Sequence, residues 1–123
     1  MEESYYLSIV VPAYKEEDRI PVMMDAIEKY VKSKDFPIET IILVDASPDN
    51  TAGVAKGYAD RIPNLRVIVG RVNRGKGGAV KHGIMEARGK YIVFADADNS
   101  TPIEQVDKLL KHVSRHEVVI GSR

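Results

Sequence analysis

Two carboxylates, Asp96 and Asp98, follow directly after a run of apolar, β-forming residues at 91–94. Such a run is typical of a strand buried on both faces, and α/β proteins bind their ligands beyond the carboxyl ends of these strands. Two like charges at this spacing repel each other unless a cation lies between them. Carboxylate oxygens are ligands that Mg²⁺ and Mn²⁺ prefer, so the pair predicts a divalent metal that carries a diphosphate.

Three other polar segments follow apolar runs, and each contains residue types that a nucleotide site needs. Residues 12–17 follow the first run and include Tyr14 and two glutamates. Asp45 follows the second run, and a basic, glycine-rich loop at 71–78 follows the third and leads into a segment of helical periodicity. Free N–H groups and the dipole at a helix N-terminus attract phosphate. Together the segments predict a nucleotide site, with acids for a metal, bases for phosphates and an acid for a ribose or base.

Each of these features also has a purely structural interpretation. Asp96 and Asp98 could be turn and helix-capping residues, and Asp45 could be a turn acid. The glycine-rich loop has no Ser or Thr after Lys76, as a Walker A motif would, and lacks the full dinucleotide fingerprint. Its glycines could serve only a tight turn, and Tyr14 could be an aromatic residue at the rim. The prediction therefore depends on the conjunction of these features at one edge.

Apolar runs that alternate with segments of helical periodicity must position these residues. We predict strands at residues 7–11, 40–44, 66–69, 91–95 and 118–120, and helices at residues 19–32, 50–60, 77–88 and 102–114. One face of the first helix carries Ile20, Met23, Ile27 and Val31, and Asp18 is its predicted N-cap. The alternation predicts a Rossmann-like, doubly wound α/β fold with a mostly parallel sheet, whose strands all end at one edge.

The bulk composition restricts the class of protein. The 123 residues suit one domain at 1–123, and 44% hydrophobic with 29% charged residues is ordinary for a globular protein. Lys plus Arg and Asp plus Glu are 18 each, so no global field favours nucleic acid as a partner. The absence of cysteine excludes disulfides and thiolate chemistry and fits a reducing compartment. With no signal peptide or membrane-spanning run, we expect a cytoplasmic protein.

In four ordered strings the chain resembles the family-2 glycosyltransferases of the GT-A fold. The strings are SIVVPAYKEED (8–18), VDASPDNT (44–51), NRGKGGAVKHGIMEARGKYIVFADADNSTP (73–102) and VVIGSR (118–123). More narrowly, they resemble the polyprenyl-phosphate (dolichyl-phosphate) mannose and glucose synthases. The resemblance implies the N-terminal half of a GT-A fold, and a sugar transferred from GDP-mannose or UDP-glucose to a polyprenyl phosphate.

The resemblance also implies a role for each candidate residue. The nucleobase and ribose pocket would be lined by Pro12, Ala13, Tyr14 and Glu16. Asp45 would contact the base or ribose, and Lys76 and Arg123 would lie near the nucleotide phosphates. Asp96 would lie against the ribose and the metal, and Asp98 would hold Mg²⁺ or Mn²⁺ on the diphosphate. The resemblance assigns no catalytic base.

Three departures from the family pattern affect these expectations. Asp45 is followed by Ala46 where the family usually has an acidic pair, and Lys15 replaces the usual Asn, which leaves the base preference open. Family enzymes also continue well past the length of this chain. We therefore expect the donor-nucleotide part of a longer enzyme, peripheral to the cytoplasmic face of a membrane if its acceptor is a lipid.

Two other functions remain open at this stage. The chain could be a non-catalytic module that binds nucleotide-sugars. It could also be a signalling receiver domain, although such a domain needs an acidic pair after its first strand, where this chain has Pro12 and Ala13. For any of these functions, an exposed apolar face and an open sheet edge predict a weakly held dimer or higher oligomer.

Overall fold

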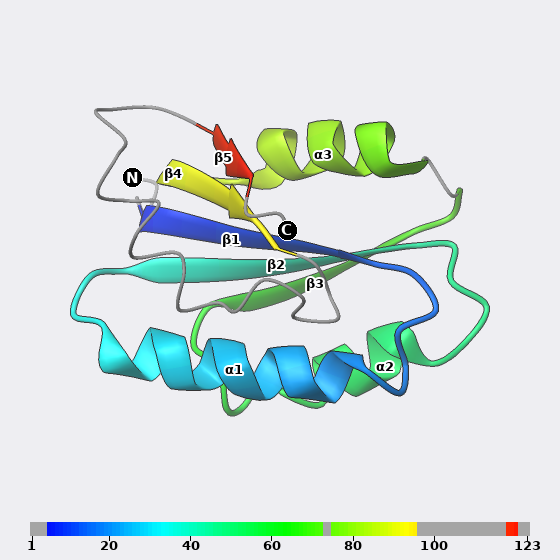
Figure 1. Cartoon of the computed structure of the whole chain (residues 1–123), viewed down its shortest axis with the longest axis horizontal. Helices are drawn as coiled ribbons and strands as arrows, with labels where there is room; N and C mark the ends of the chain where they lie inside the picture. The colour runs from blue at the N-terminus through cyan, green and yellow to red at the C-terminus, as the bar shows by residue number, and fades with distance from the viewer. Residues whose placement is uncertain (1–4, 73–74, 96–117, 121–123) are drawn as a thin grey trace.

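The computed structural model describes residues 5–72, 75–95 and 118–120, and it contains a five-stranded parallel sheet (Figure 1). The strands are β1 (Tyr5–Ala13), β2 (Ile38–Asp45), β3 (Leu65–Gly70), β4 (Gly89–Phe94) and β5 (Val118–Ile120), in the spatial order β3-β2-β1-β4-β5. The described helices are α1 (Ile20–Ser33), α2 (Thr51–Lys56) and α3 (Gly75–Glu86). Figure 1 shows α1 and α2 on one face of the sheet and α3 on the other. The predicted doubly wound, Rossmann-like α/β fold is confirmed.

The strand register brings the carboxyl ends of the strands to one edge of the sheet. The β1–β2 ladder extends to Ala13, and Asp45 at the end of β2 lies opposite Gly70 at the end of β3. β4 reaches the same edge, because the N–H of Ala95 donates to the carbonyl of Val10 at 3.0 Å. The loops that follow β1, β2 and β3 therefore begin side by side, and the N-terminus of α3 lies at this end of the sheet (Figure 1).

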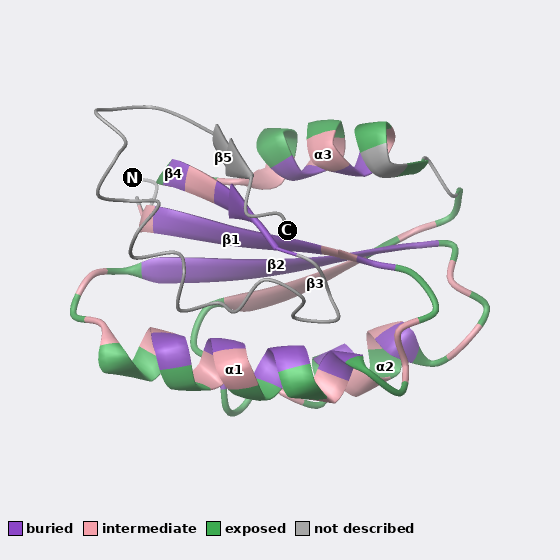
Figure 2. Cartoon of the chain, in the orientation of Figure 1, coloured by how far each residue is buried: buried purple, intermediate pink, exposed green. Residues whose placement is uncertain are grey.

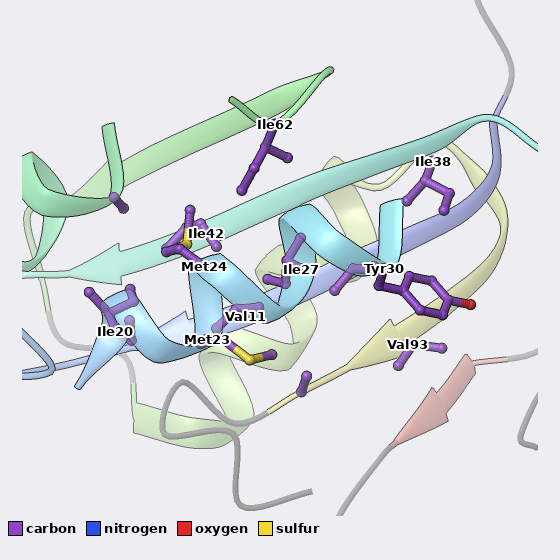
Figure 3. Packing of buried hydrophobic residues seen from close by; sticks show 14 of the residues in the cluster. Val11, Ile20, Met23, Met24, Ile27, Tyr30, Ile38, Ile42, Ile62 and Val93 are labelled. Carbon is purple, nitrogen blue, oxygen red and sulfur yellow. The ribbon is translucent and has the colours of Figure 1, made fainter. Parts of the chain in front are cut away.

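The larger core lies between the sheet and the α1 and α2 layer (Figure 3). The predicted apolar face of α1 is confirmed at Ile20, Met23 and Ile27, which have no exposed surface. Met24 is fully buried beside them, and Val31 packs at the margin of the core. β1 and β2 are buried along most of their length (Figure 2), which explains the apolar runs at residues 9–11 and 41–44 within them.

A smaller core lies under α3, built from Val10, Ile41, Leu43 and Phe94. α3 approaches the sheet closely because Gly83 faces it. A Cβ atom on Gly83 would lie 2.8 Å from Cγ1 of Val10 and 2.9 Å from Cε1 of Phe94. This glycine therefore serves packing, since its backbone is in the ordinary helical region.

Most predicted elements agree with the structure to within two residues at each end, and two predictions are wrong. Helix α2 ends at Lys56, whereas we predicted a helix to residue 60; beyond Gly57 the chain continues in tight turns. Asp18 is not the cap of α1, because the N-cap is Arg19. The carbonyl of Glu16 already accepts the N–H groups of Arg19 and Ile20, and Pro21 has no N–H to be capped.

The predicted helix at 102–114 lies outside the described residues. Among the helices in the described part of the chain, none is both long enough and apolar enough to cross a membrane.

Candidate functional site

Asp45 is the residue with the most unusual environment at the carboxyl edge of the sheet. Its side chain is only 8% exposed, and neither carboxylate oxygen has a hydrogen-bond partner within the described residues. A Cβ atom on Gly70, the residue opposite, would overlap Oδ1 of Asp45, so only glycine leaves room for this carboxylate. Burying an unpaired charge is costly, and a ligand that supplies N–H or O–H groups would remove that cost.

The loop after β1 brings the other predicted nucleoside residues to this edge. Pro12 and Ala13 are the last residues of β1, with Ala13 buried beside β2. Tyr14 is 43% exposed at the start of the loop, and the ammonium of Lys15 lies 5.5 Å from the centre of its ring. Glu16 forms an ion pair at 2.8 Å with Nε of Arg19. The loop thus places an exposed aromatic ring next to a strand end that adjoins β2.

Three side chains that the sequence analysis did not single out hold this loop in place. They are Ser47 and Asp49 of the β2–α2 loop and Thr51, the first residue of α2, here called the Ser47–Asp49–Thr51 cluster. The cluster accepts hydrogen bonds from the successive N–H groups of residues 15–17. Both hydroxyls of the cluster donate to Oδ1 of Asp49, at 2.6 Å from Ser47 and 2.5 Å from Thr51. The alternation of short polar side chains before a helix is the sequence signal that could have found the cluster.

The cluster keeps Asp49 ionised. Hydrogen bonds from Ser47, and next from Thr51, lower the pKa of Asp49 from 3.8 to about 2. Asp49 therefore carries its negative charge at any pH near neutrality, and it accepts donors from Glu17, Ser47 and Thr51. Its environment is the opposite of that of Asp45, although both carboxylates lie in the same region.

The predicted phosphate-binding region begins at the N-terminus of α3. Gly75 has a φ of +72°, and Lys76 lies in the first turn of the helix, with its side chain outside what the structure describes. A Cβ atom on Gly75 or Gly77 would meet no atom of the described residues within 4 Å. Both glycines therefore differ from Gly83, which is enclosed by the core.

The remaining predicted site residues, Asp96, Asp98 and Arg123, lie outside the described residues. β4 nevertheless carries the chain to the carboxyl edge as far as Ala95. Within residues 5–72, 75–95 and 118–120, no group of three or more His, Asp or Glu side chains could hold a metal. Of the predicted site residues that the structure describes, Ala13, Tyr14, Glu16 and Asp45 lie on two adjacent loops and strand ends.

Comparison with protein families gives one match across nearly the whole chain. Residues 8–123 match the family described as Glycosyl transferase family 2. The match includes β1 from Ser8 onward, both loops at the carboxyl edge and the acids after β4.

Among curated proteins, the chain is similar to dolichyl-phosphate beta-glucosyltransferases. The protein from Dictyostelium discoideum is 38% identical over 133 residues, which covers 98% of this chain and 41% of that protein. The protein from Homo sapiens is 44% identical over 112 residues, covering 85% of this chain and 35% of that protein. The chain therefore spans about two fifths of the length of the curated relatives it matches.

Solved structures with a similar fold contain nucleotide-sugars. S. aureus TarS in complex with UDP-GlcNAc has a TM-score of 0.72 at 25% identity, covering 86% of this chain and 30% of that chain. The mannosyltransferase PcManGT from Pyrobaculum calidifontis, in complex with GDP-Man and Mn²⁺, has a TM-score of 0.66 at 27% identity. That match covers 78% of this chain and 28% of the mannosyltransferase.

Proposed function

The chain belongs to glycosyl transferase family 2, and on that premise we propose that it binds UDP-glucose for the transfer of glucose to dolichyl phosphate. Glucose is favoured over mannose because the curated relatives carry the name of dolichyl-phosphate beta-glucosyltransferases. Since the chain spans about two fifths of their length, we assign it as a single donor-binding domain, at residues 1–123, of a longer enzyme. Its lipid acceptor would hold that enzyme at the cytoplasmic face of a membrane.

The observation that carries the proposal is the buried carboxylate of Asp45 at the carboxyl edge of the sheet, which has no hydrogen-bond partner among the described residues. A uracil ring N–H or a ribose hydroxyl would donate to it, and such a charge-assisted bond is stronger than one between neutral groups. The ring of Tyr14, exposed on the neighbouring loop, is available to cover the nucleoside. Ligand binding at this edge agrees with the general placement of sites in open α/β sheets.

The chemistry of the segment after β4 fits a divalent cation. Asp96 and Asp98 would hold Mg²⁺ or Mn²⁺ through carboxylate oxygens, which are ligands both ions accept. Mn²⁺ accompanies GDP-Man in the mannosyltransferase structure, which supports a metal of this class. When bound, the cation neutralises the charge of the departing nucleoside diphosphate. Lys76 and Arg123 would add positive charge near the phosphates, and Lys76 lies in the first turn of α3.

Calorimetric titration of the chain with UDP-glucose and GDP-mannose, each with Mn²⁺ and with EDTA, tests the proposal. We expect UDP-glucose to bind more tightly and only with Mn²⁺, and Asp98→Ala to abolish the metal dependence. Asp45→Asn should weaken binding by about tenfold or more, because a hydrogen bond to a charged group is replaced. Gly70→Ala should weaken it as well, since the new methyl group displaces the Asp45 carboxylate.

The matched control is Asp35→Asn, which removes an exposed carboxylate from the loop before β2, at the opposite edge of the sheet. It should leave both titrations unchanged. Tighter binding of GDP-mannose would reassign the donor, and no binding of either nucleotide-sugar by the wild-type chain would contradict the proposed function.

A second candidate, a module that binds nucleotide-sugars without transferring them, is favoured by the partial coverage of the relatives. Formation of glucosyl lipid from UDP-glucose and dolichyl phosphate by the chain would exclude it. The receiver-domain hypothesis loses its support, because the chain belongs to a different family.

A further inference from the structure

Three successive backbone N–H groups of the β1–α1 loop donate to the Ser47–Asp49–Thr51 cluster of the next loop. The N–H of Lys15 lies 2.9 Å from Oγ of Ser47, and the N–H of Glu16 lies 3.0 Å from Oγ1 of Thr51. The N–H of Glu17 lies 3.2 Å from Oδ2 of Asp49. We propose that Asp49, acting through Ser47 and Thr51, is a positioning residue that holds the β1–α1 loop in the shape that receives the nucleoside; this inference rests on the proposed function.

Asp49 sets the direction of both hydroxyl groups. A hydroxyl has one hydrogen to donate, and Ser47 and Thr51 each donate it to Oδ1 of Asp49. Their lone pairs are thereby left for the N–H groups of Lys15 and Glu16. Without the carboxylate, each hydroxyl could rotate, and its hydrogen would compete with the loop N–H group for the same space.

The backbone of two residues beside the cluster has an unfavourable conformation. Lys15 has a φ of +55° and Ala46 a φ of +53°, in the left-handed region that side chains other than glycine rarely adopt. Lys15 stands next to Tyr14, and Ala46 stands next to Asp45. Such conformations persist only where the surrounding structure determines them, and they concentrate at functional sites. The hydrogen bond from Lys15 to Ser47 links the two strained loops directly.

The contacts of Asp49 distinguish positioning from direct binding. Oδ1 accepts both hydroxyls and the N–H of Thr51, and Oδ2 accepts the N–H of Glu17. With these donors in place, its oxygens are committed to the protein, whereas neither oxygen of Asp45 has a hydrogen-bond partner in the part of the chain that the structure describes. Asp49 therefore acts on the nucleoside through the loop. Ordering the loop before binding lowers the entropy that binding must overcome.

The test compares a ligand that contains the nucleoside with one that lacks it. Wild type, Asp49→Ala and Asp49→Asn are titrated with UDP and with inorganic pyrophosphate, both with Mn²⁺. For Asp49→Ala we expect the Kd of UDP to rise by about tenfold, with pyrophosphate affected by less than about twofold. The Kd of UDP for Asp49→Asn should lie between the values for wild type and Asp49→Ala, because the amide keeps one accepting oxygen.

Amide hydrogen exchange by NMR supplies a measurement that needs no ligand. In Asp49→Ala the N–H groups of residues 15–17 should exchange faster, while those of β1 keep their protection. Ser47→Ala removes a single acceptor, that of Lys15, and should weaken UDP binding without loss of the fold. Its matched control is Ser33→Ala, whose hydroxyl donates to the carbonyl of Tyr30 at the far end of α1.

The outcomes separate the inference from the proposed function. Equal UDP affinity in wild type and Asp49→Ala overturns the inference and leaves the function standing. Equal losses of affinity for UDP and for pyrophosphate also overturn it. A carboxylate that only stabilised the start of α2 would affect the whole domain, and therefore both ligands alike. If wild type binds neither ligand, the proposed function fails, and the positioning role fails with it.

Discussion

At the scale of single residues, the carboxyl edge of the sheet holds two carboxylates with opposite hydrogen-bond environments. Asp45 is buried, and its oxygens have no hydrogen-bond partner within residues 5–72, 75–95 and 118–120, whereas Asp49 accepts donors from its own loop and from the loop after β1. A carboxylate saturated by protein donors stabilises the fold. A buried carboxylate without donors is available to a ligand. The same residue type therefore stabilises the loops at one position and is the proposed binding group at another.

The lowered pKa of Asp49 predicts how stability depends on pH. Since the pKa falls from 3.8 to about 2 on folding, ionised Asp49 stabilises the protein above about pH 4, and this stabilisation is lost as the pH falls toward 2. The difference in unfolding free energy between wild type and Asp49→Asn should be constant near neutrality and shrink between pH 4 and pH 2. Urea unfolding followed by circular dichroism across this range measures it.

The control for this prediction is Ser33→Ala, which removes a hydrogen bond without removing a titrating group. The difference in unfolding free energy between Ser33→Ala and wild type should not change over the same pH range. If the difference in unfolding free energy between wild type and Asp49→Asn is undiminished at pH 2.5, the hydrogen bonds of Asp49 do not depend on its charge.

At the scale of elements, hydrogen bonds between the β1–α1 loop and the Ser47–Asp49–Thr51 cluster hold two neighbouring loops together at the carboxyl edge. Each cluster bond to the β1–α1 loop joins residues 32 to 35 positions apart in the chain. On the other face of the sheet, α3 is positioned by a close approach at Gly83. The first arrangement shapes the loop that we propose receives the nucleoside, and the second determines where the N-terminus of α3 lies.

Gly83→Ala should destabilise the protein by about 1–2 kcal/mol. The new methyl group would contact Val10 and Phe94 at less than 3.0 Å, and overpacking a core costs about 1–3 kcal/mol. The higher helix propensity of alanine than of glycine offsets up to about 1 kcal/mol of that cost. Urea unfolding of the variant measures the net change.

Gly77→Ala is the matched control for this substitution, because a Cβ atom there meets nothing within 4 Å. In the same helix it should be neutral or stabilising by up to about 1 kcal/mol. Equal stabilities of the two variants would show that α3 can move away from the sheet at little cost.

At the scale of the whole molecule, the described sheet has an open strand at each side. β3 pairs only with β2, and β5 pairs only with β4, within the part of the chain that the structure describes. β3 and the segment after it also expose Val69 at 53% and Val72 at 62%. An unpaired strand edge with apolar side chains favours association with another chain.

The weak oligomer expected from the sequence stays a prediction and can be measured directly. Light scattering should give an average mass that rises with protein concentration. Val69→Lys, which places a charge on the exposed edge strand, should lower the association without loss of the fold. A monomeric mass at all concentrations would contradict the prediction.

The sequence by itself determined the order of strands and helices and the parallel α/β fold. Unbroken apolar runs such as residues 41–44 identify strands buried on both faces, and helical periodicity identifies α1 through Ile20, Met23 and Ile27. Because parallel strands end at a common edge, the sequence also located Tyr14, Glu16 and Asp45 in one region. The ends of α1 and α2 were less predictable, since Glu16 and Gly57 act there through backbone hydrogen bonds.

Only the tertiary structure decided which of these groups is free to bind and which is committed to the fold. Asp45 and Asp49 look alike in the sequence, and only the folded chain shows that Asp49 accepts donors from Ser47, Thr51 and the N–H of Glu17, while Asp45 accepts none within the described residues. The need for glycine at position 70 likewise arises from the Asp45 side chain on the adjacent strand. Hydrogen bonds and steric contacts at this range depend on how strands and loops are brought together, and local sequence patterns carry no record of them.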